Sequence, residues 1–356
     1  MIHNEMRKHG IKLVLGYTVE GFKGKDNGVE VLLKDNPSLQ ADMVVLAIGV
    51  TPDTVLAKEA GLELGIKESI VVNDRMETSV PDIYAAGDAV QVKHYVTGND
   101  ALISLAGPAN KQGRIIADNI CGGDSRYLGS QGSSVIKVFD MTAATTGINE
   151  TNAKKSGLEV DTVILSPMSH AGYYPGGKVM TMKVIFEKES YRLLGAQIIG
   201  YEGVDKRIDV LATAIHAGLN ATQLKDLDLA YAPPYSSAKD PVNMAGFMID
   251  NIAKGTLKQW HLEDMDKISK DKDVVLLDVR TVGEFSMGHI DGFKNIPVDE
   301  LRERISEIEK GKPVYLICQS GLRSYIASRI LEGNGYETYN FSGGFRFYDA
   351  VVNDRA

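Results

Sequence analysis

The sequence predicts a protein of α/β class with more than one domain. Its 356 residues are enough for two or three domains, each with its own core. Two apolar runs, 42–48 and 314–317, have the length and composition of buried strands, and each is followed by a Gly-containing turn or loop. Between them, a series of strand-like runs precedes a helical pattern at 203–217, which is typical of an α+β domain.

Composition excludes several classes of function. The net charge is −8 and basic residues are scattered, which argues against a nucleic-acid partner. No apolar run is long enough to span a bilayer, and the first residues have no stretch of signal-peptide type, so we expect no membrane association. The two cysteines, Cys121 and Cys318, do not suggest a disulfide scaffold and fit a reducing, cytoplasmic compartment. No histidine spacing suggests a metal site.

The first 120 residues contain fragments of a dinucleotide-binding fold. Residues 4–9 predict a helix that leads into a strand at 10–15, and the strand at 42–48 ends in a turn that contains Gly49 and Pro52. A further short strand, at 81–86, ends at Gly87 and Asp88. Glycine allows a ligand to approach the backbone, and an aspartate can accept hydrogen bonds from the hydroxyls of a sugar-like chain. The alternative for this pair is a strand followed by an ordinary acidic turn.

Residues 125–250 predict an antiparallel α+β domain. Apolar side chains recur at helical spacing within 203–217, which indicates a helix packed on a sheet. The expected strands are 134–139, 161–166, 179–186 and 193–201.

Two tyrosine-containing loops lie in the same region. Tyr173 and Tyr174 precede a Pro-Gly pair, and Tyr231 lies two residues before Pro233. Gly and Pro restrict both loops, so the phenols are presented in defined positions. From composition alone, packing or an interface would explain these tyrosines.

The most informative motif is an apolar strand, 314–317, that delivers Cys318 into a short polar loop opening a helix. Backbone N–H groups of such a loop and the positive end of the helix favour a thiolate, and Arg323 would add a full positive charge. The thiolate could act as a nucleophile and hold a persulfide anion equally well. The alternative is a buried structural cysteine. The residues around the sulfur would be Gln319, Ser320, Gly321, Leu322 and Ser324.

Residues 262–356 resemble the rhodanese family. The motifs that carry the resemblance appear in the family's order, and they are Asp278-Val-Arg280, Glu284-Phe285, Gly288-His289-Ile290, the Cys318 loop and Gly343-Gly344-Phe345. The resemblance implies sulfur transfer through a persulfide on Cys318. The family often has arginine directly after the cysteine, whereas this chain has Gln319, which argues against the dianion thiosulfate as the donor.

Residues 1–250 resemble the later part of the pyridine nucleotide-disulfide oxidoreductases. This resemblance rests on the Ala-Ile-Gly segment ending at Gly49, the Ala-Ala-Gly-Asp segment ending at Asp88 and the helix start at 105–114. It implies a tail of an NAD(P)-binding domain (1–40), the C-terminal part of an FAD-binding Rossmann-like domain (41–124), a dimerisation domain (125–250) and a linker (251–261). The implied FAD-site residues are Gly49, Pro52, Gly87, Asp88, which would bond the ribityl chain, and Ala106, which begins a helix beside the flavin.

The tyrosine loops and the rhodanese-like region narrow this resemblance to the coenzyme A-disulfide reductase group of that family. It implies FAD, NAD(P)H and coenzyme A, a homodimer through 125–250, and a reaction on coenzyme A disulfide, persulfide or polysulfide. Tyr173 and Tyr231 would then approach the partner subunit's redox cysteine and the coenzyme A sulfur.

This chain has no Gly-x-Gly-x-x-Gly motif and no cysteine that would match the flavin-side redox cysteine. Without the pyrophosphate-binding loop, we expect the chain not to bind FAD tightly. Two other functions stay open at this point. One is a stand-alone sulfurtransferase, and the other is a non-catalytic dimeric redox sensor.

Overall fold

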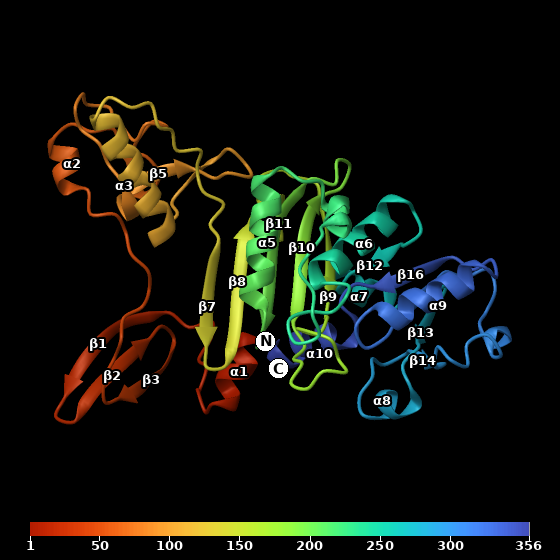
Figure 1. The fold of residues 1–356 in the computed structure, drawn as a ribbon. Helices are drawn as coiled ribbons and strands as arrows, with labels where there is room; N and C mark the ends of the chain where they lie inside the picture. Colours follow the sequence, from red (N-terminus) through yellow and green to blue (C-terminus); the bar gives the residue numbers. More distant parts are fainter. Residues whose placement is uncertain (356) are drawn as a thin grey trace. The chain divides into compact units, whose positions relative to one another are not determined.

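The computed structural model describes residues 1–355, and the chain divides into two compact units. One unit comprises His3–Val92 and Ala101–Tyr127, and the other comprises 1–2, Lys93–Asp100 and the chain from Leu128 onward (Figure 1). Among the described residues, no helix is long and apolar enough to cross a membrane.

The first unit is built from small sheets and short helices. A three-stranded antiparallel meander joins neighbouring strands in sequence, and a second sheet has the order β4-β5-β6. The strands are β1 (Val19–Lys25), β2 (Gly28–Leu33), β3 (Asn36–Ala41), β4 (Ile70–Val71), β5 (Val90–Lys93) and β6 (Asp100–Ala101). The helices are α1 (Ile2–Lys8), α2 (Val55–Glu59) and α3 (Ala106–Ile120), with 3₁₀ turns η1 (Ile66–Glu68) and η2 (Gly87–Ala89).

The predicted helices near residue 5 and at 106 are confirmed as α1 and α3, but three predicted strands are wrong. Residues 10–15 and 42–48 form no strand, and within 81–86 only an isolated bridge at Tyr84 pairs with another residue. Val45 and Ile48 are 76% and 90% exposed. An apolar segment becomes a buried strand only when other strands flank it, and no strand of the described residues pairs with 42–48.

The predicted antiparallel domain forms a five-stranded sheet with the order β7-β8-β11-β10-β9. All four predicted strands are present, and β8, which sequence reasoning missed, completes the sheet. The strands are β7 (Ser134–Val138), β8 (Met141–Gly147), β9 (Val160–Leu165), β10 (Thr181–Glu187) and β11 (Leu193–Gly200). Around them lie α4 (Glu150–Lys155), α5 (Val204–His216), η3 (Ala221–Asp226) and α6 (Pro241–Ala253).

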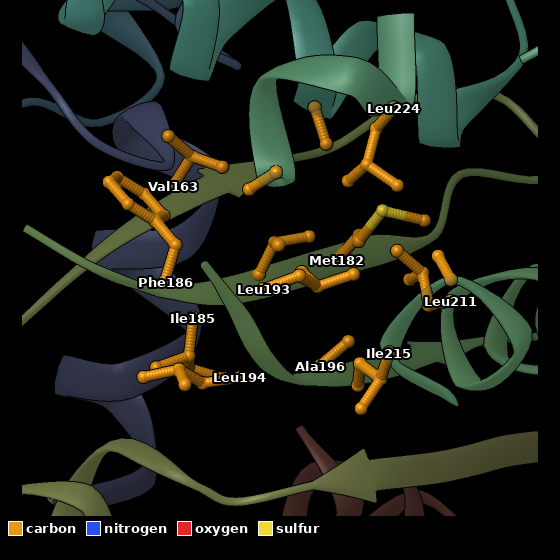
Figure 2. Packing of buried hydrophobic residues seen from close by; sticks show 14 of the residues in the cluster. Val163, Met182, Ile185, Phe186, Leu193, Leu194, Ala196, Leu211, Ile215 and Leu224 are labelled. Atoms are coloured by element: carbon orange, nitrogen blue, oxygen red, sulfur yellow. The ribbon is translucent and has the colours of Figure 1, made fainter. Parts of the chain in front are cut away.

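The core of this domain lies between the sheet and the helices. Helix α5 packs on β8 and β11, and α6 packs on η3 and β9 (Figure 1). Figure 2 shows side chains of strands β10 and β11, including Met182 and Leu193, which belong to one buried cluster with Leu211 of α5 and Leu224 of η3. Leu211 and Leu224 are fully buried here. This packing confirms the helical spacing seen in the sequence.

The C-terminal region forms a five-stranded parallel sheet with the order β12-β16-β15-β13-β14. The strands are β12 (Gln259–Trp260), β13 (Val275–Asp278), β14 (Lys294–Asn295), β15 (Val314–Ile317) and β16 (Thr338–Phe341). The helices that the site uses are α8 (Val282–Ser286), α9 (Leu322–Glu332) and α10 (Gly344–Arg355). Short turns η4 (Leu262–Asp264), α7 (Met265–Ile268) and η5 (Ile305–Glu307) complete it.

Specific hydrogen bonds join the C-terminal region to the edge strand β9. The Ile164 backbone N–H donates to the Ser342 hydroxyl at 3.1 Å, and both residues are buried. The Gln259 amide donates to the Thr162 carbonyl at 2.8 Å, and His261 lies 3.0 Å from the Asp161 carboxylate. The segment predicted as a linker, 251–261, contains the end of α6 and the whole of strand β12.

Candidate active site

Cys318 lies where the sequence predicts, directly after β15 and before α9. Its Sγ accepts hydrogen bonds from the Gly321 backbone N–H at 3.1 Å and from the Ser324 hydroxyl at 3.2 Å. The residue is 1% exposed. Donors aimed at the sulfur stabilise its anion, so the site is suited to a thiolate or a persulfide.

The loop backbone turns tightly at Gly321, which has φ +100 and is the N-cap residue of α9. A side chain with a Cβ is strained in that conformation. The Gly321 carbonyl accepts a hydrogen bond from the buried Asn340 amide at 3.1 Å. Of the other predicted loop residues, Leu322 is exposed and Ser320 is half-buried.

The Gly343-Gly344-Phe345 segment closes the loop from the other side. The Phe345 N–H donates to the Cys318 carbonyl at 2.8 Å, and the Arg346 N–H donates to the Gln319 carbonyl at 3.1 Å. At Gly344, which has φ +67, a Cβ would lie 2.8 Å from the Cys318 carbonyl oxygen. Only glycine fits there, which gives the second Gly of the motif a physical role.

Arg323 lies beside the loop, as the sequence predicts, but its positive charge is paired with a carboxylate. Its two terminal nitrogens donate to the two carboxylate oxygens of Glu284 at 2.6 and 2.7 Å. The guanidinium is the main cause that lowers the pKa of Glu284 to about 2, against the opposing effect of burial. The sequence did not predict this partner, because Glu284 lies 39 residues upstream and only folding brings it against the loop.

Three residues of the rhodanese-like motifs, Asp278, Arg280 and Glu284, had no predicted role at the site. Arg280 and Asp278 are fully buried and form an ion pair at 2.7 Å. The Arg280 guanidinium also lies 3.9 Å from the centre of the Phe345 ring and donates to the Gln319 side chain at 3.4 Å. The sequence does contain a signal for Asp278 and Arg280. They are charged residues at the carboxyl end of an apolar strand, where sites form in parallel sheets.

The two predicted tyrosines meet although 58 residues separate them. The hydroxyls of Tyr173 and Tyr231 are 2.7 Å apart. This hydrogen bond is the first cause that raises the pKa of Tyr231 above its usual value. Tyr174 instead packs edge-on against His170, with ring centres 5.7 Å apart. The geometry therefore selects Tyr173 rather than Tyr174 as the neighbour of Tyr231.

A buried arginine holds the two tyrosine loops together. Arg207 on α5 donates to the Ser169 carbonyl at 2.9 Å, to the Tyr235 carbonyl at 3.4 Å and to the Asp240 carboxylate at 3.0 Å. A cavity of about 570 Å³ lies beside it, and its lining includes Tyr231 and Lys206. Tyr231 thus stands at the edge of a cavity large enough for part of a ligand, and Tyr173 is hydrogen-bonded to it.

The predicted FAD-site residues are not gathered in this way. Gly49 is exposed, in the segment that forms no strand, with Pro52 just beyond it. Asp88 is exposed on η2, whose Gly87 N–H donates to the Gln112 side chain at 2.7 Å, and Ala106 is exposed at the start of α3. These residues do not form a site that fits a flavin, because the segment 42–49, predicted as a buried strand and its turn, is largely exposed and belongs to no sheet. In the described residues, no group of acids, histidines and cysteines could hold a metal ion.

Known families match this chain along almost its whole length. Residues 1–113 match the pyridine nucleotide-disulphide oxidoreductase family, 133–241 match the dimerisation domain of that family, and 261–350 match the rhodanese-like domain. The chain therefore belongs to the pyridine nucleotide-disulphide oxidoreductases and carries a rhodanese-like domain.

Individual relatives narrow this assignment. The chain is similar to reduced Bacillus anthracis CoADR-RHD, with 47% identity and a TM-score of 0.95 over 99% of this chain and 63% of that one. An NAD-dependent persulfide reductase from A. fulgidus is 40% identical, with a TM-score of 0.88 over 98% of this chain and 63% of that one. The NAD(P)H coenzyme A polysulfide/persulfide reductase of Pyrococcus horikoshii is 34% identical over 68% of this chain and 54% of its own length. The chain thus spans about half the length of the curated relatives it matches.

Proposed function

We propose that this chain is part of an FAD- and NAD(P)H-dependent reductase of coenzyme A disulfide, persulfide or polysulfide, in which the rhodanese-like domain transfers sulfane sulfur through Cys318. One observation carries the sulfurtransferase half of this proposal, namely the pair of hydrogen bonds from Gly321 and Ser324 to the Cys318 sulfur. The domain order and the relatives' activities support the reductase half.

In the proposed transfer, the Cys318 thiolate attacks the outer sulfur of a hydropersulfide R–S–SH. A new S–S bond forms on Cys318 while the S–S bond between the outer sulfur and the inner sulfur of the donor breaks, and the released thiolate RS⁻ takes up the proton. The persulfide is then attacked at its outer sulfur by the thiolate of coenzyme A, which leaves as its persulfide and restores the Cys318 thiolate. The two donors that stabilise the thiolate would serve the persulfide anion as well, and burial would keep both from oxidants in bulk solvent. A reducing, cytoplasmic compartment suits this chemistry.

We assign Tyr173 and Tyr231 to the coenzyme A side of the reaction. Two phenols 2.7 Å apart can present one free O–H to a developing thiolate, which would stabilise the leaving sulfur in thiol–disulfide exchange. Both tyrosines are exposed, 78% and 46%, so a partner subunit can reach them. We propose a homodimer through 125–250, which sedimentation of the purified chain would test.

The family implies a flavin, which would supply electrons from NAD(P)H to the reacting disulfide. The residues described above do not fit a tight FAD site, so we expect the purified chain to lack flavin absorbance and to act as a sulfurtransferase by itself. A stoichiometric yellow chromophore near 450 nm in the purified protein would contradict this expectation.

The decisive test is the Cys318→Ser variant. We expect it to lose sulfur transfer from polysulfide to coenzyme A thiol or to cyanide by more than about 1,000-fold, because the persulfide carrier is gone. Its oligomeric state should not change. The matched control is Cys121→Ser, which removes the exposed cysteine at the end of α3 and should keep full activity. Retained transfer in Cys318→Ser would overturn the sulfurtransferase assignment.

A further inference from the structure

Two ion pairs lie beside the Cys318 loop. Arg323 begins α9 beside the loop, and its guanidinium forms a two-point ion pair with Glu284 of α8. Arg280, which contacts the Gln319 side chain, is paired with Asp278 in the same manner. The guanidinium groups of Arg323 and Arg280 therefore each face a carboxylate of opposite charge.

Glu284 is held in place independently of Arg323. One carboxylate oxygen accepts from the Thr281 N–H at 3.0 Å and from the Thr281 hydroxyl at 2.9 Å, which forms a capping box at the start of α8. The Glu284 N–H donates back to the Thr281 hydroxyl at 3.2 Å. The carboxylate is thus fixed beside the loop rather than free to leave when an anion approaches.

The attraction of an anionic sulfur donor to the loop depends on the net charge of the groups beside it. A free guanidinium would attract a dianion about twice as strongly as a monoanion, because Coulomb energy scales with the product of the charges. A guanidinium already matched by a fixed carboxylate provides no such net attraction. The two donors that contact the Cys318 sulfur, the Gly321 N–H and the Ser324 hydroxyl, are both neutral.

We propose that Glu284 determines the donor selectivity of the sulfurtransferase, favouring a neutral or singly charged hydropersulfide over dianionic thiosulfate by compensating the charge of Arg323. This inference rests on the proposed function and names its donor class. With thiosulfate, the Cys318 thiolate would take the outer sulfur and release sulfite, so two negative charges must enter and leave the loop. With a hydropersulfide, a neutral or singly charged molecule enters and a thiol leaves.

A charge series tests the proposal through the ratio of kcat/KM for thiosulfate to kcat/KM for an alkyl hydropersulfide R–S–SH, which is at most singly charged. Glu284→Gln gives the Arg323 site a net charge of +1 and should raise this ratio about tenfold at low salt. Arg323→Gln leaves Glu284 unpaired and should lower the ratio. The double variant has no net charge and should return to the wild-type ratio. Both rates come from one sample, so partial unfolding of a variant cancels in the ratio.

One control separates the charge beside the loop from the net charge of the domain. Glu307→Gln breaks a comparable ion pair with Arg304 elsewhere in the domain and should leave the ratio unchanged. High salt should reduce the effect of Glu284→Gln.

The outcomes are distinguishable. A ratio that follows the order Glu284→Gln, wild type and double variant together, then Arg323→Gln supports the proposal. An unchanged ratio in Glu284→Gln, with Cys318-dependent transfer in the wild type, overturns this inference alone. An equal shift in Glu307→Gln would assign the effect to the net charge of the domain and also overturn it. No Cys318-dependent transfer from any donor would overturn the proposed function and this inference together.

Discussion

Strand β15 and the segment 42–48 have nearly the same apolar pattern, but the structure treats them in opposite ways. In β15, Val314 and Leu316 are fully buried, because β13 and β16 pair on either side. In the other segment, Val45 and Ile48 are exposed and form no strand. The difference shows that an apolar run specifies the tendency to be buried, while its flanking strands decide whether burial happens.

A similar contrast holds for two motif glycines, Gly344 after β16 and Gly49 after the segment 42–48. Gly344 lies against the Cys318 loop, and three backbone atoms are within 2.8 Å of its ideal Cβ position. Gly49 also has a positive φ, but nothing lies within 4 Å of its ideal Cβ position. A motif glycine therefore has a packing role only where its neighbours are in place.

The largest expected effect is on stability. Leu316→Ala should lower the free energy of unfolding of the C-terminal domain by about 3 kcal/mol, because it leaves a cavity between paired strands. Leu46→Ala, at a residue that is 65% exposed, should change it by less than about 0.5 kcal/mol. Urea unfolding followed by Trp260 fluorescence measures this, since the single tryptophan is buried in that domain. Equal losses in the two variants would contradict the comparison.

A smaller effect is expected at the two glycines. Gly344→Ala should cost about 2 kcal/mol, because a positive φ and a backbone clash act together, and it should reduce sulfur transfer by displacing the Cys318 loop. Gly49→Ala should cost about 1 kcal/mol or less, and sulfur transfer should be unchanged. Thermal melting and the polysulfide assay measure the two effects. Full activity in Gly344→Ala would show that the loop tolerates its displacement.

The smallest expected effect is the loss of folding stability at acidic pH through Glu284. The pKa of Glu284 is about 2 in the folded protein, below its ordinary value of 4.5, so the carboxylate stabilises the fold fully above about pH 4.5 and loses this contribution as the pH falls towards 2. We expect about 1 kcal/mol, because the pair is partly exposed. The advantage of the wild type over Glu284→Gln in urea unfolding should therefore shrink between pH 5 and pH 3. A constant difference over this range would contradict the assigned cause.

Local sequence was sufficient to predict much of this protein. The position of Cys318 between a strand and a helix, the strands of the middle domain and the helix α5 all follow from patterns within some ten residues, because strand and helix periodicities are local properties. The rhodanese and oxidoreductase motifs were visible for the same reason. β8 was missed because its run, Met141–Gly147, is rich in Ala and Thr rather than in large apolar residues.

Only the tertiary structure decided how these pieces act on one another. The pairing of Glu284 with Arg323 spans 39 positions, and the contact of Tyr173 with Tyr231 spans 58. No local pattern encodes such contacts, since they depend on which strands become neighbours and how the loops between them turn. The exposure of 42–48 has the same origin. The amino-acid sequence by itself predicted where a thiolate could form, and the packing around Cys318 decided which charged side chains lie beside that position.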